Sequence, residues 1–509
     1  MSASAPGTSI PSPVSWVALV VILVGTFVTT LDFFIINVAI PSLATELHAT
    51  PAGIEWVIAG YAIAIAGGLI VGARLGDLFG HRRLFMVGLV VFTLASAACG
   101  AAATSGELVA ARFVQGAGAA LLTPQVLAMI GHLYAGERRQ RAFTLYGLTL
   151  GLAAVLGQLI GGLLIAADVF GLSWRLCFLI NLPVGIIALI LVPILIPTYR
   201  TGATGGLDLP GAVLGTTAIS AIVLALIQGR QLGWPLWIWG CLAGGLIAAA
   251  LFVRYQRRRG LAGRGPLVDL AIFHNRRFAV SILTMFTFFI ANASFYLTLS
   301  LYLQGALGLS PLGGGALFGL MGVGYFATVL RPPFLVARLG RHWIPAGVVL
   351  MGAGLSLLLL VVGLLGVDTT IPLVVPGMVV AGMGVGMVLA PLSALVMSTV
   401  APEQLGGASG ILGTVQQVGN SLGIALVGLV FFDLLGEAPT PVRYGDAFAG
   451  GLVVQLTVLG VVLLLARWLG RLMAAPRSDG HEPADATTPL PAASGRGGSS
   501  ESGLVTSGH

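Results

Sequence analysis

The residues best suited to chemistry in this sequence are a few ionisable and polar side chains inside long apolar segments. Asp32 comes first, since it is the only acid deep within any such segment, about sixteen residues from the start of the first one. An ionisable group at membrane depth costs free energy, so such residues are rare and usually functional. Apolar surroundings favour the neutral form of a carboxylic acid, so we expect Asp32 to bind and release a proton. The alternative is a structural hydrogen bond to a neighbouring helix.

Arg112 and Gln115 form a second candidate pair in the fourth apolar segment. Residues three apart share one face of a helix, so both side chains point the same way. Arg112 lies about five residues into its segment. One interpretation is an arginine that extends its charged end to the outer interface. The other is a fixed positive charge near Asp32 that promotes release of its proton.

Further polar side chains in the apolar segments are candidates for lining a substrate cavity or for tying helices together. For the cavity we consider Asn37, Gln115, Gln158, Asn292, Tyr296, Gln416 and Asn420. Around Gln158, the glycines Gly157, Gly161 and Gly162 include a spacing of four residues, which lets helices approach closely. We assign these glycines to helix packing or to a hinge.

The sequence shows no sign of an enzyme. We find no GxSxG, no HExxH, no phosphate-binding loop, and no His or Cys cluster with the spacing of metal ligands. Cys99, Cys177 and Cys241 each lie in an apolar segment, which favours small buried side chains over a disulfide framework. We therefore expect no catalytic residue, no metal and no cofactor.

The chain that must position these residues is apolar throughout. Of 509 residues, 57% are hydrophobic and 8% charged, against roughly 25% charged in a soluble domain. A soluble fold with so few charges would expose large apolar patches, so that class is excluded. Segments long enough to cross a bilayer recur along the chain. We count fourteen, at about 15–39, 52–73, 83–103, 107–130, 142–166, 174–197, 208–229, 234–254, 278–304, 312–337, 343–366, 371–399, 405–433 and 447–472.

Arginines predict the orientation of these spans. All 25 basic residues are arginine, and they cluster in the connections that follow even-numbered spans. Since cytoplasmic loops are enriched in basic residues, we expect a multi-pass protein of the cell membrane with both termini in the cytoplasm. The net charge of +7 therefore reports topology, and we expect no nucleic-acid partner. Segments 1–14 and 474–509 are expected to be disordered cytoplasmic tails.

The connection after the second span contains the most recognisable motif. Gly72 begins it, and Asp77, Gly80, Arg82 and Arg83 follow. This stretch resembles the loop motif Gly-x-Leu-Ala-Asp-Arg-x-Gly-Arg-Lys of the major facilitator superfamily.

Three other segments extend the resemblance to the fourteen-span drug/proton antiporters of that superfamily. Residues 31–41 are similar to the signature Leu-Asp-x-Thr-x-x-Asn-x-Ala-Leu-Pro, and residues 112–118 match the motif Arg-x-x-Gln-Gly-x-Gly, which is linked to proton transfer. Residues 174–185 also look like a sixth-span signature of this group. Span five departs from the antiporter motif Gly-Pro-x-x-Gly-Gly, because Gln158 stands in place of the proline.

The resemblance implies an all-α membrane fold of two six-helix bundles, at 15–200 and 278–473, plus two extra central helices and an arginine-rich linker within 201–277. It implies proton coupling through Asp32 and Arg112. It also implies that Asp77 pairs with basic groups and with a helix N-terminus of the other half, which would latch the outward-facing state.

The function that follows is proton-driven efflux of amphipathic small molecules by alternating access. The expected partners are membrane lipid, the small-molecule substrate and protons, and the protein is expected to be a monomer. Two rival functions are proton-coupled transport of a specific endogenous metabolite and a non-transporting membrane receptor. An ion channel is not favoured, because no filter-forming sequence is present.

Overall fold

The computed structural model describes residues 15–198, 206, 208–264, 266–330, 338–436 and 440–474. These residues form helices and connections, without any strand among them. Fourteen helical segments are long and apolar enough to cross a membrane, which confirms the predicted number of spans. Helices suit such a chain because each satisfies its own backbone hydrogen bonds in lipid. The segments predicted as disordered tails fall almost entirely outside the described residues.

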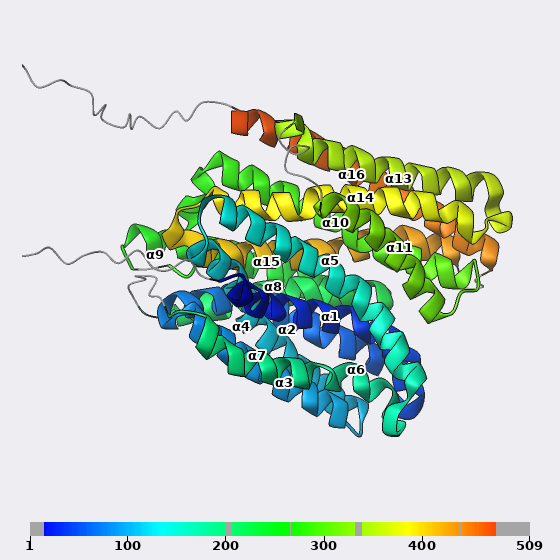
Figure 1. Ribbon diagram of the computed structural model, residues 1–509, viewed down its shortest axis with the longest axis horizontal. Coiled ribbons are helices and arrows are strands. Elements are labelled where there is room, and N and C mark those ends of the chain that lie inside the picture. Colours follow the sequence, from blue (N-terminus) through cyan, green and yellow to red (C-terminus); the bar gives the residue numbers. More distant parts are fainter. Residues whose placement is uncertain are drawn as a thin grey trace, which may run out of the picture.

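The first six spans form one bundle, coloured blue to green-cyan in Figure 1. Its helices are α1 (Trp16–Glu46), α2 (Pro51–Phe79), α3 (His81–Ala101), α4 (Ser105–Leu133), α5 (Gly136–Ala167), α6 (Leu176–Leu179) and α7 (Asn181–Leu195), with short 3-10 turns at Val169–Gly171 and Ser173–Arg175. α1 continues beyond the predicted end at residue 39 to Glu46. Asp32 therefore lies near the middle of α1.

The last six spans form a second bundle, which lies above the first in Figure 1. Its helices are α10 (Arg276–Gly305), α11 (Pro311–Val329), α13 (Trp343–Leu365), α14 (Ile371–Ser398), α15 (Leu405–Leu435) and α16 (Pro441–Ala474). Short 3-10 turns precede or follow them at Leu270–His274, Gly340–His342, Gly366–Asp368 and Pro402–Gln404.

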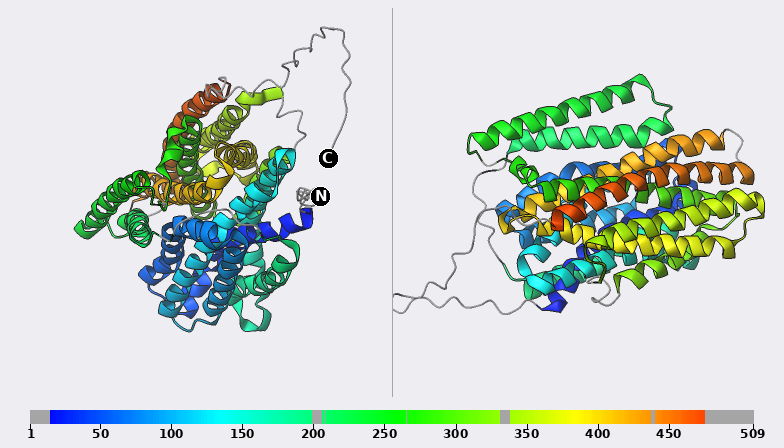
Figure 2. Two further views of the ribbon diagram at one scale, coloured as in Figure 1. Left: turned by 90° about the vertical axis from the view of Figure 1, so that its left-hand side faces the viewer. Right: turned by 90° about the horizontal axis from the view of Figure 1, so that it is seen from above.

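The two additional helices, α8 (Leu209–Gln231) and α9 (Leu236–Leu261), are central in the sequence but peripheral in space. Figure 2 shows this green hairpin on the outside of the molecule. α8 packs against α2 of the first bundle and α15 of the second, whereas α9 packs mainly on α8. The Thr216 hydroxyl donates a hydrogen bond of 2.9 Å to the Gly67 carbonyl of α2. α8 therefore covers a seam between the bundles.

The bundles are in close contact at the end where α1 begins and α16 ends. We call this the basic end, because arginine clusters follow the even-numbered spans there. α2 and α4 pack against α15, and α5 packs against α11 and α14. A Cβ added to Gly410 would lie 2.7 Å from the Cβ of Ala73, so α2 and α15 are almost in backbone contact.

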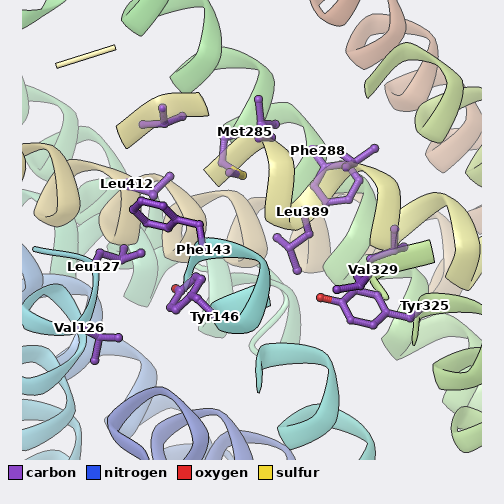
Figure 3. Close-up of a cluster of buried hydrophobic side chains, with 14 of the residues drawn as sticks. Val126, Leu127, Phe143, Tyr146, Met285, Phe288, Tyr325, Val329, Leu389 and Leu412 are labelled. Atoms are coloured by element: carbon purple, nitrogen blue, oxygen red, sulfur yellow. The ribbon is translucent and has the colours of Figure 1, made fainter. Parts of the chain in front are cut away.

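Apolar side chains fill the rest of this interface. In Figure 3, Phe143 and Tyr146 of α5 face Leu389 of α14 and Leu412 of α15, and all four belong to one buried cluster. The Tyr325 hydroxyl of α11 donates a hydrogen bond to the Gly147 carbonyl of α5. This part of the interface is therefore mainly apolar among the described residues.

Within the first bundle, glycine sets the distance between α2 and α4. A Cβ on Gly72 would overlap the backbone carbonyl oxygen of Ala120. Neither helix can move away alone, because the Gln125 side chain of α4 also donates a 2.8 Å hydrogen bond to the Gly72 carbonyl. Gly72, predicted as part of the latch motif, thus also has a packing role.

We predict that Gly72→Ala destabilises the protein by about 1–3 kcal/mol, the usual cost of overpacking a core. The measurement is thermal unfolding of the purified full-length protein in detergent. Gly319→Ala is the matched control, since a Cβ on this α11 residue has nothing within 4 Å. Equal melting temperatures for the two variants would contradict the packing role.

Candidate functional site

Asp32 and Arg112 form an ion pair in the interior of the first bundle. Nη1 of Arg112 lies 2.5 Å from Oδ2 of Asp32. Asp32 is 0% exposed and Arg112 is 1% exposed, so neither charge is in contact with solvent or lipid. The structure therefore places Arg112 inside the bundle beside Asp32 rather than at the interface, and its role in proton release stays a prediction.

The second carboxylate oxygen of Asp32 is held by two amide side chains. Nε2 of Gln115 donates to Oδ1 at 2.8 Å, and Nδ2 of Asn181 donates to the same oxygen at 3.1 Å. Both amides also donate to the Ser96 hydroxyl, at 3.2 and 3.1 Å. Ser96 in turn donates to the Phe178 carbonyl at 2.9 Å. The carboxylate is thus bonded to helices α4 and α7 and indirectly to α3.

The guanidinium of Arg112 is satisfied in a similar way. Nη1 also donates to the Gln115 side-chain carbonyl at 2.8 Å, and Nε donates to the Val57 carbonyl of α2 at 3.2 Å. The Tyr61 ring centroid lies 4.2 Å from the guanidinium carbon, within range of a cation–π contact. A buried pair is tolerated when its remaining polar atoms are paired, and removing one partner is strongly destabilising.

Gln115 requires a correction. It was predicted to line the substrate cavity, but it is 0% exposed and bonded to Asp32, Arg112 and Ser96 inside the first bundle. Its spacing from Arg112 correctly placed both side chains on one face of α4. That face is directed into the bundle and away from the second bundle.

The latch motif lies where the two bundles meet. Asp77 is near the end of α2, and its carboxylate lies against Gly406, where a Cβ would overlap it. Gly406 is in the first turn of α15, whose backbone N–H groups carry partial positive charge. The resemblance implied such a contact, and the structure brings the two groups together.

The other motif residues shape the connection around Asp77. Gly80 has a φ of 94°, a conformation that favours glycine, and it lets α3 begin directly after α2. Nη2 of Arg82 donates to the Pro193 carbonyl of α7 at 3.0 Å. Arg83 is exposed. His81, which the sequence analysis did not single out, lies 3.4 Å from Asp77.

The remaining cavity candidates divide into two groups. Tyr296 of α10 lies between the bundles, with its ring centroid 6.2 Å from that of Phe34 in α1. Asn292 lies one helical turn before Tyr296 and is 8% exposed. Gln416 and Asn420 follow Gly413 on α15 at helical spacing, and a Cβ on Gly413 would lie 3.2 Å from Leu69 of α2. These four positions are therefore on the interbundle side.

For the other group, only the position of the backbone is described. Asn37 and Gln158 lie in α1 and α5, and their side chains are outside the described part of the structure. Gly157 and Gly161 face α1, where a Cβ would lie 3.0 Å from the Leu31 carbonyl and 2.8 Å from the Ile35 side chain. Gly162 instead faces Leu312 of α11 in the second bundle. All three glycines lie at close helix contacts, as packing residues should.

Within the described ranges, no three His, Cys, Asp or Glu side chains are grouped as they would be to hold a metal ion. The polar partners that sequence reasoning missed are Ser96, His81 and Gln125. Asn181 was noted only as part of a span signature. Ser96 and His81 both lie on α3, Gln125 on α4 and Asn181 on α7, and only proximity to Asp32 or Asp77 reveals the role of each.

We predict that Gly406→Ala displaces Asp77 from the first turn of α15 and weakens closure of the basic end. A cysteine placed at the buried position Ala73 should then react several-fold faster with a thiol reagent. Gly407→Ala is the neighbouring control, because a Cβ there has nothing within 4 Å. Equal cysteine reactivity in both variants would show that the Asp77 contact does not hold the interface.

Known proteins resemble this arrangement over most of the chain. Residues 22–424 match the Major Facilitator Superfamily. The chain is 35% identical to the probable actinorhodin transporter of Streptomyces coelicolor, over 84% of this chain and 74% of that protein. It is 33% identical to the puromycin resistance protein pur8 of Streptomyces alboniger, over 95% of this chain and 96% of that protein.

Solved structures agree in fold. The human organic anion transporter MFSD10 superposes with a TM-score of 0.61 at 14% sequence identity, over 88% of this chain and 98% of that one. The helix count, the buried motif residues and the sequence matches agree, and they confirm the resemblance drawn from the motifs. The chain is a multi-pass membrane transporter that belongs to the Major Facilitator Superfamily.

Proposed function

We propose that this transporter exports amphipathic small molecules in exchange for protons, with the basic end in the cytoplasm. The observation that carries the proposal is the buried pair of Asp32 and Arg112, whose charges contact neither solvent nor lipid. Burying a charge pair at this depth costs free energy, and apolar residues of similar volume could fill the same space equally well. A role in folding alone would therefore not explain the pair.

The geometry suggests how a proton could be used. A proton that binds a carboxylate oxygen of Asp32 removes the negative charge and leaves Arg112 without its counterion. The amide donors Gln115 and Asn181 then face a neutral acid, and hydrogen bonds to a charged acceptor are stronger than those to a neutral one. Since these donors lie on α4 and α7, proton binding on α1 loosens three helices of one bundle at once.

Loosening within one bundle can change how the two bundles meet. α1 packs against α5, and α5 makes the direct contacts with α11 and α14 of the second bundle. Gly157 and Gly161 keep α1 and α5 close enough for a small shift of α1 to reach the interface. This connection would couple protonation of Asp32 to alternating access.

Two observations support export as the direction of transport: the contacts that close the basic end, and the names of two similar proteins. The basic end is closed by the contacts of Asp77 with Gly406 and of α5 with α11 and α14. If that end faces the cytoplasm, as the arginine distribution favours, this is the closure expected of an outward-facing or occluded exporter. The two relatives described above are named for actinorhodin transport and puromycin resistance. Small amphipathic antibiotics are therefore the substrates that we propose.

The proposed partners are the membrane lipid, one small-molecule substrate and protons. We expect a monomer to be sufficient, because side chains of one copy already bond both carboxylate oxygens of Asp32.

We predict that Asp32→Asn reduces uphill, proton-driven uptake of puromycin or a fluorescent amphipathic dye into everted vesicles to the level of vesicles lacking the protein. The amide keeps the size of the side chain but cannot exchange a proton. Asp433→Asn is the control, since Asp433 is an exposed acid on α15. Full gradient-driven transport by Asp32→Asn, at equal membrane abundance, would refute proton coupling through this residue.

A further inference from the structure

His81 and Asp77 form a buried pair of titratable groups beside the interbundle contact. His81 is the first residue of α3 and is 1% exposed. Its Nε2 lies 3.4 Å from Oδ1 of Asp77, and the Asp77 side chain is 10% exposed. The same carboxylate lies against Gly406 in the first turn of α15. The pair therefore belongs to the first bundle but contacts the second.

Gln125 of α4 determines which nitrogen of His81 carries a hydrogen. Nε2 of Gln125 donates to the carbonyls of Gly72 and Leu121, at 2.8 and 2.9 Å. Its other side-chain atom, Oε1, can then only accept a hydrogen bond. Oε1 lies 2.7 Å from Nδ1 of His81, so Nδ1 must be the donor. The opposite orientation of the amide would direct its carbonyl oxygen at two other carbonyl oxygens.

This assignment leaves Nε2 of His81 facing Asp77. In a neutral imidazole with its hydrogen on Nδ1, Nε2 carries a lone pair. A lone pair directed at a charged carboxylate is repulsive, and both groups are buried. The repulsion disappears when one proton is present, either on Nε2 or on the carboxyl group of Asp77. The two forms are microstates of one shared site.

We propose that His81 and Asp77 form a second proton-binding site, which takes up one proton when the basic end closes and loses it when that end opens. The site is separate from the Asp32 pair and lies at the opposite end of α2 from Val57, which bonds to Arg112. The inference rests on the proposed cytoplasmic orientation of the basic end. The site exchanges its proton with that side and makes closure of the basic end depend on the pH there.

Neighbouring charged groups define the electrostatics of the pair. Arg74 of α2 is the positively charged side chain that interacts with Asp77. On α4, the His132 ring centroid lies 5.5 Å from that of His81, and a charge on His132 would disfavour one on His81. α15 contributes the positive end of its helix dipole at Gly406, which stabilises a charged Asp77 and so places the shared proton of the closed form on Nε2 of His81.

The consequence is a pH-dependent interface. Because only the closed form holds the proton, a higher pH at the basic end favours opening. One linked proton changes the ratio of closed to open molecules by up to about tenfold per pH unit. Opening towards the side of higher pH is the direction that proton-driven export requires.

The test measures this ratio directly in the full-length protein in lipid nanodiscs. Spin labels go on cysteines introduced by Glu137→Cys on α5 and Glu403→Cys before α15, both of which are exposed positions at the basic end of opposite bundles. Cys241→Ser removes the one free cysteine that is not buried. Asp32→Asn is included in every sample, so the result does not depend on proton binding at Asp32. Distance distributions are recorded from pH 5 to pH 9.

We expect the closed fraction to fall as the pH rises, with a slope approaching tenfold per pH unit. His81→Gln keeps a neutral donor beside Asp77 without a titratable ring, so its slope should be close to zero. Asp77→Asn should also abolish the slope, and this variant replaces His81→Gln in the test if His81→Gln does not fold. His132→Gln should retain it. The proposal is overturned if the parent shows no slope, if His81→Gln keeps it, or if only His132→Gln removes it.

Discussion

A carboxylate and a guanidinium at membrane depth can persist only if each compensates the other and both have their remaining polar atoms bonded. In this transporter that requirement is met by residues from five helices. Asp32 comes from α1, Arg112 and Gln115 from α4, Asn181 from α7, Ser96 from α3 and the Val57 carbonyl from α2. No one of these helices can rotate without leaving a buried charge or donor unpaired. The ion pair thus fixes the internal arrangement of the first bundle, on which the contact with the second bundle depends.

The two kinds of interface in the molecule differ in how easily they can separate. Inside the first bundle, glycines bring helix backbones together and buried hydrogen bonds cross between helices, as at Gly72 and Gln125. Between the bundles, the described contacts include many apolar side chains, the Tyr325 hydroxyl and the Asp77 carboxylate against a helix N-terminus. In lipid, parting an apolar surface costs less than exposing polar groups. The bundles are therefore built to move as units.

Much of the fold could be predicted from sequence, because spans must be long and apolar and basic residues mark their ends. Asp32 and Arg112 were identifiable for the same reason, as charges where charges are rare. The predicted location of Gln115 was wrong because α4 is apolar on most sides. The sequence spacing shows that Arg112 and Gln115 share one face of the helix, but not which neighbouring helices that face contacts. Ser96 and His81 carry no signal of their own, since one serine in a span is ordinary and one histidine at a helix start looks solvated. α1 continues beyond the predicted end of the first span to Glu46, because a helix can extend past the apolar segment that defines the span.

The position of α8 makes the two sides of the transporter unequal. α8 packs on both α2 and α15, so it shields the seam between these helices from lipid, whereas α5, α11 and α14 meet at another seam. Among the described helices, only α8 and α9 lie outside the two six-span bundles, and they cover the α2 and α15 side (Figure 2). A rocking motion of the bundles must slide one of them past α8. A hydrophobic compound dissolved in the membrane thus meets one seam that α8 covers and one seam that neither α8 nor α9 covers. Two six-helix bundles alone would lack this difference between the two seams.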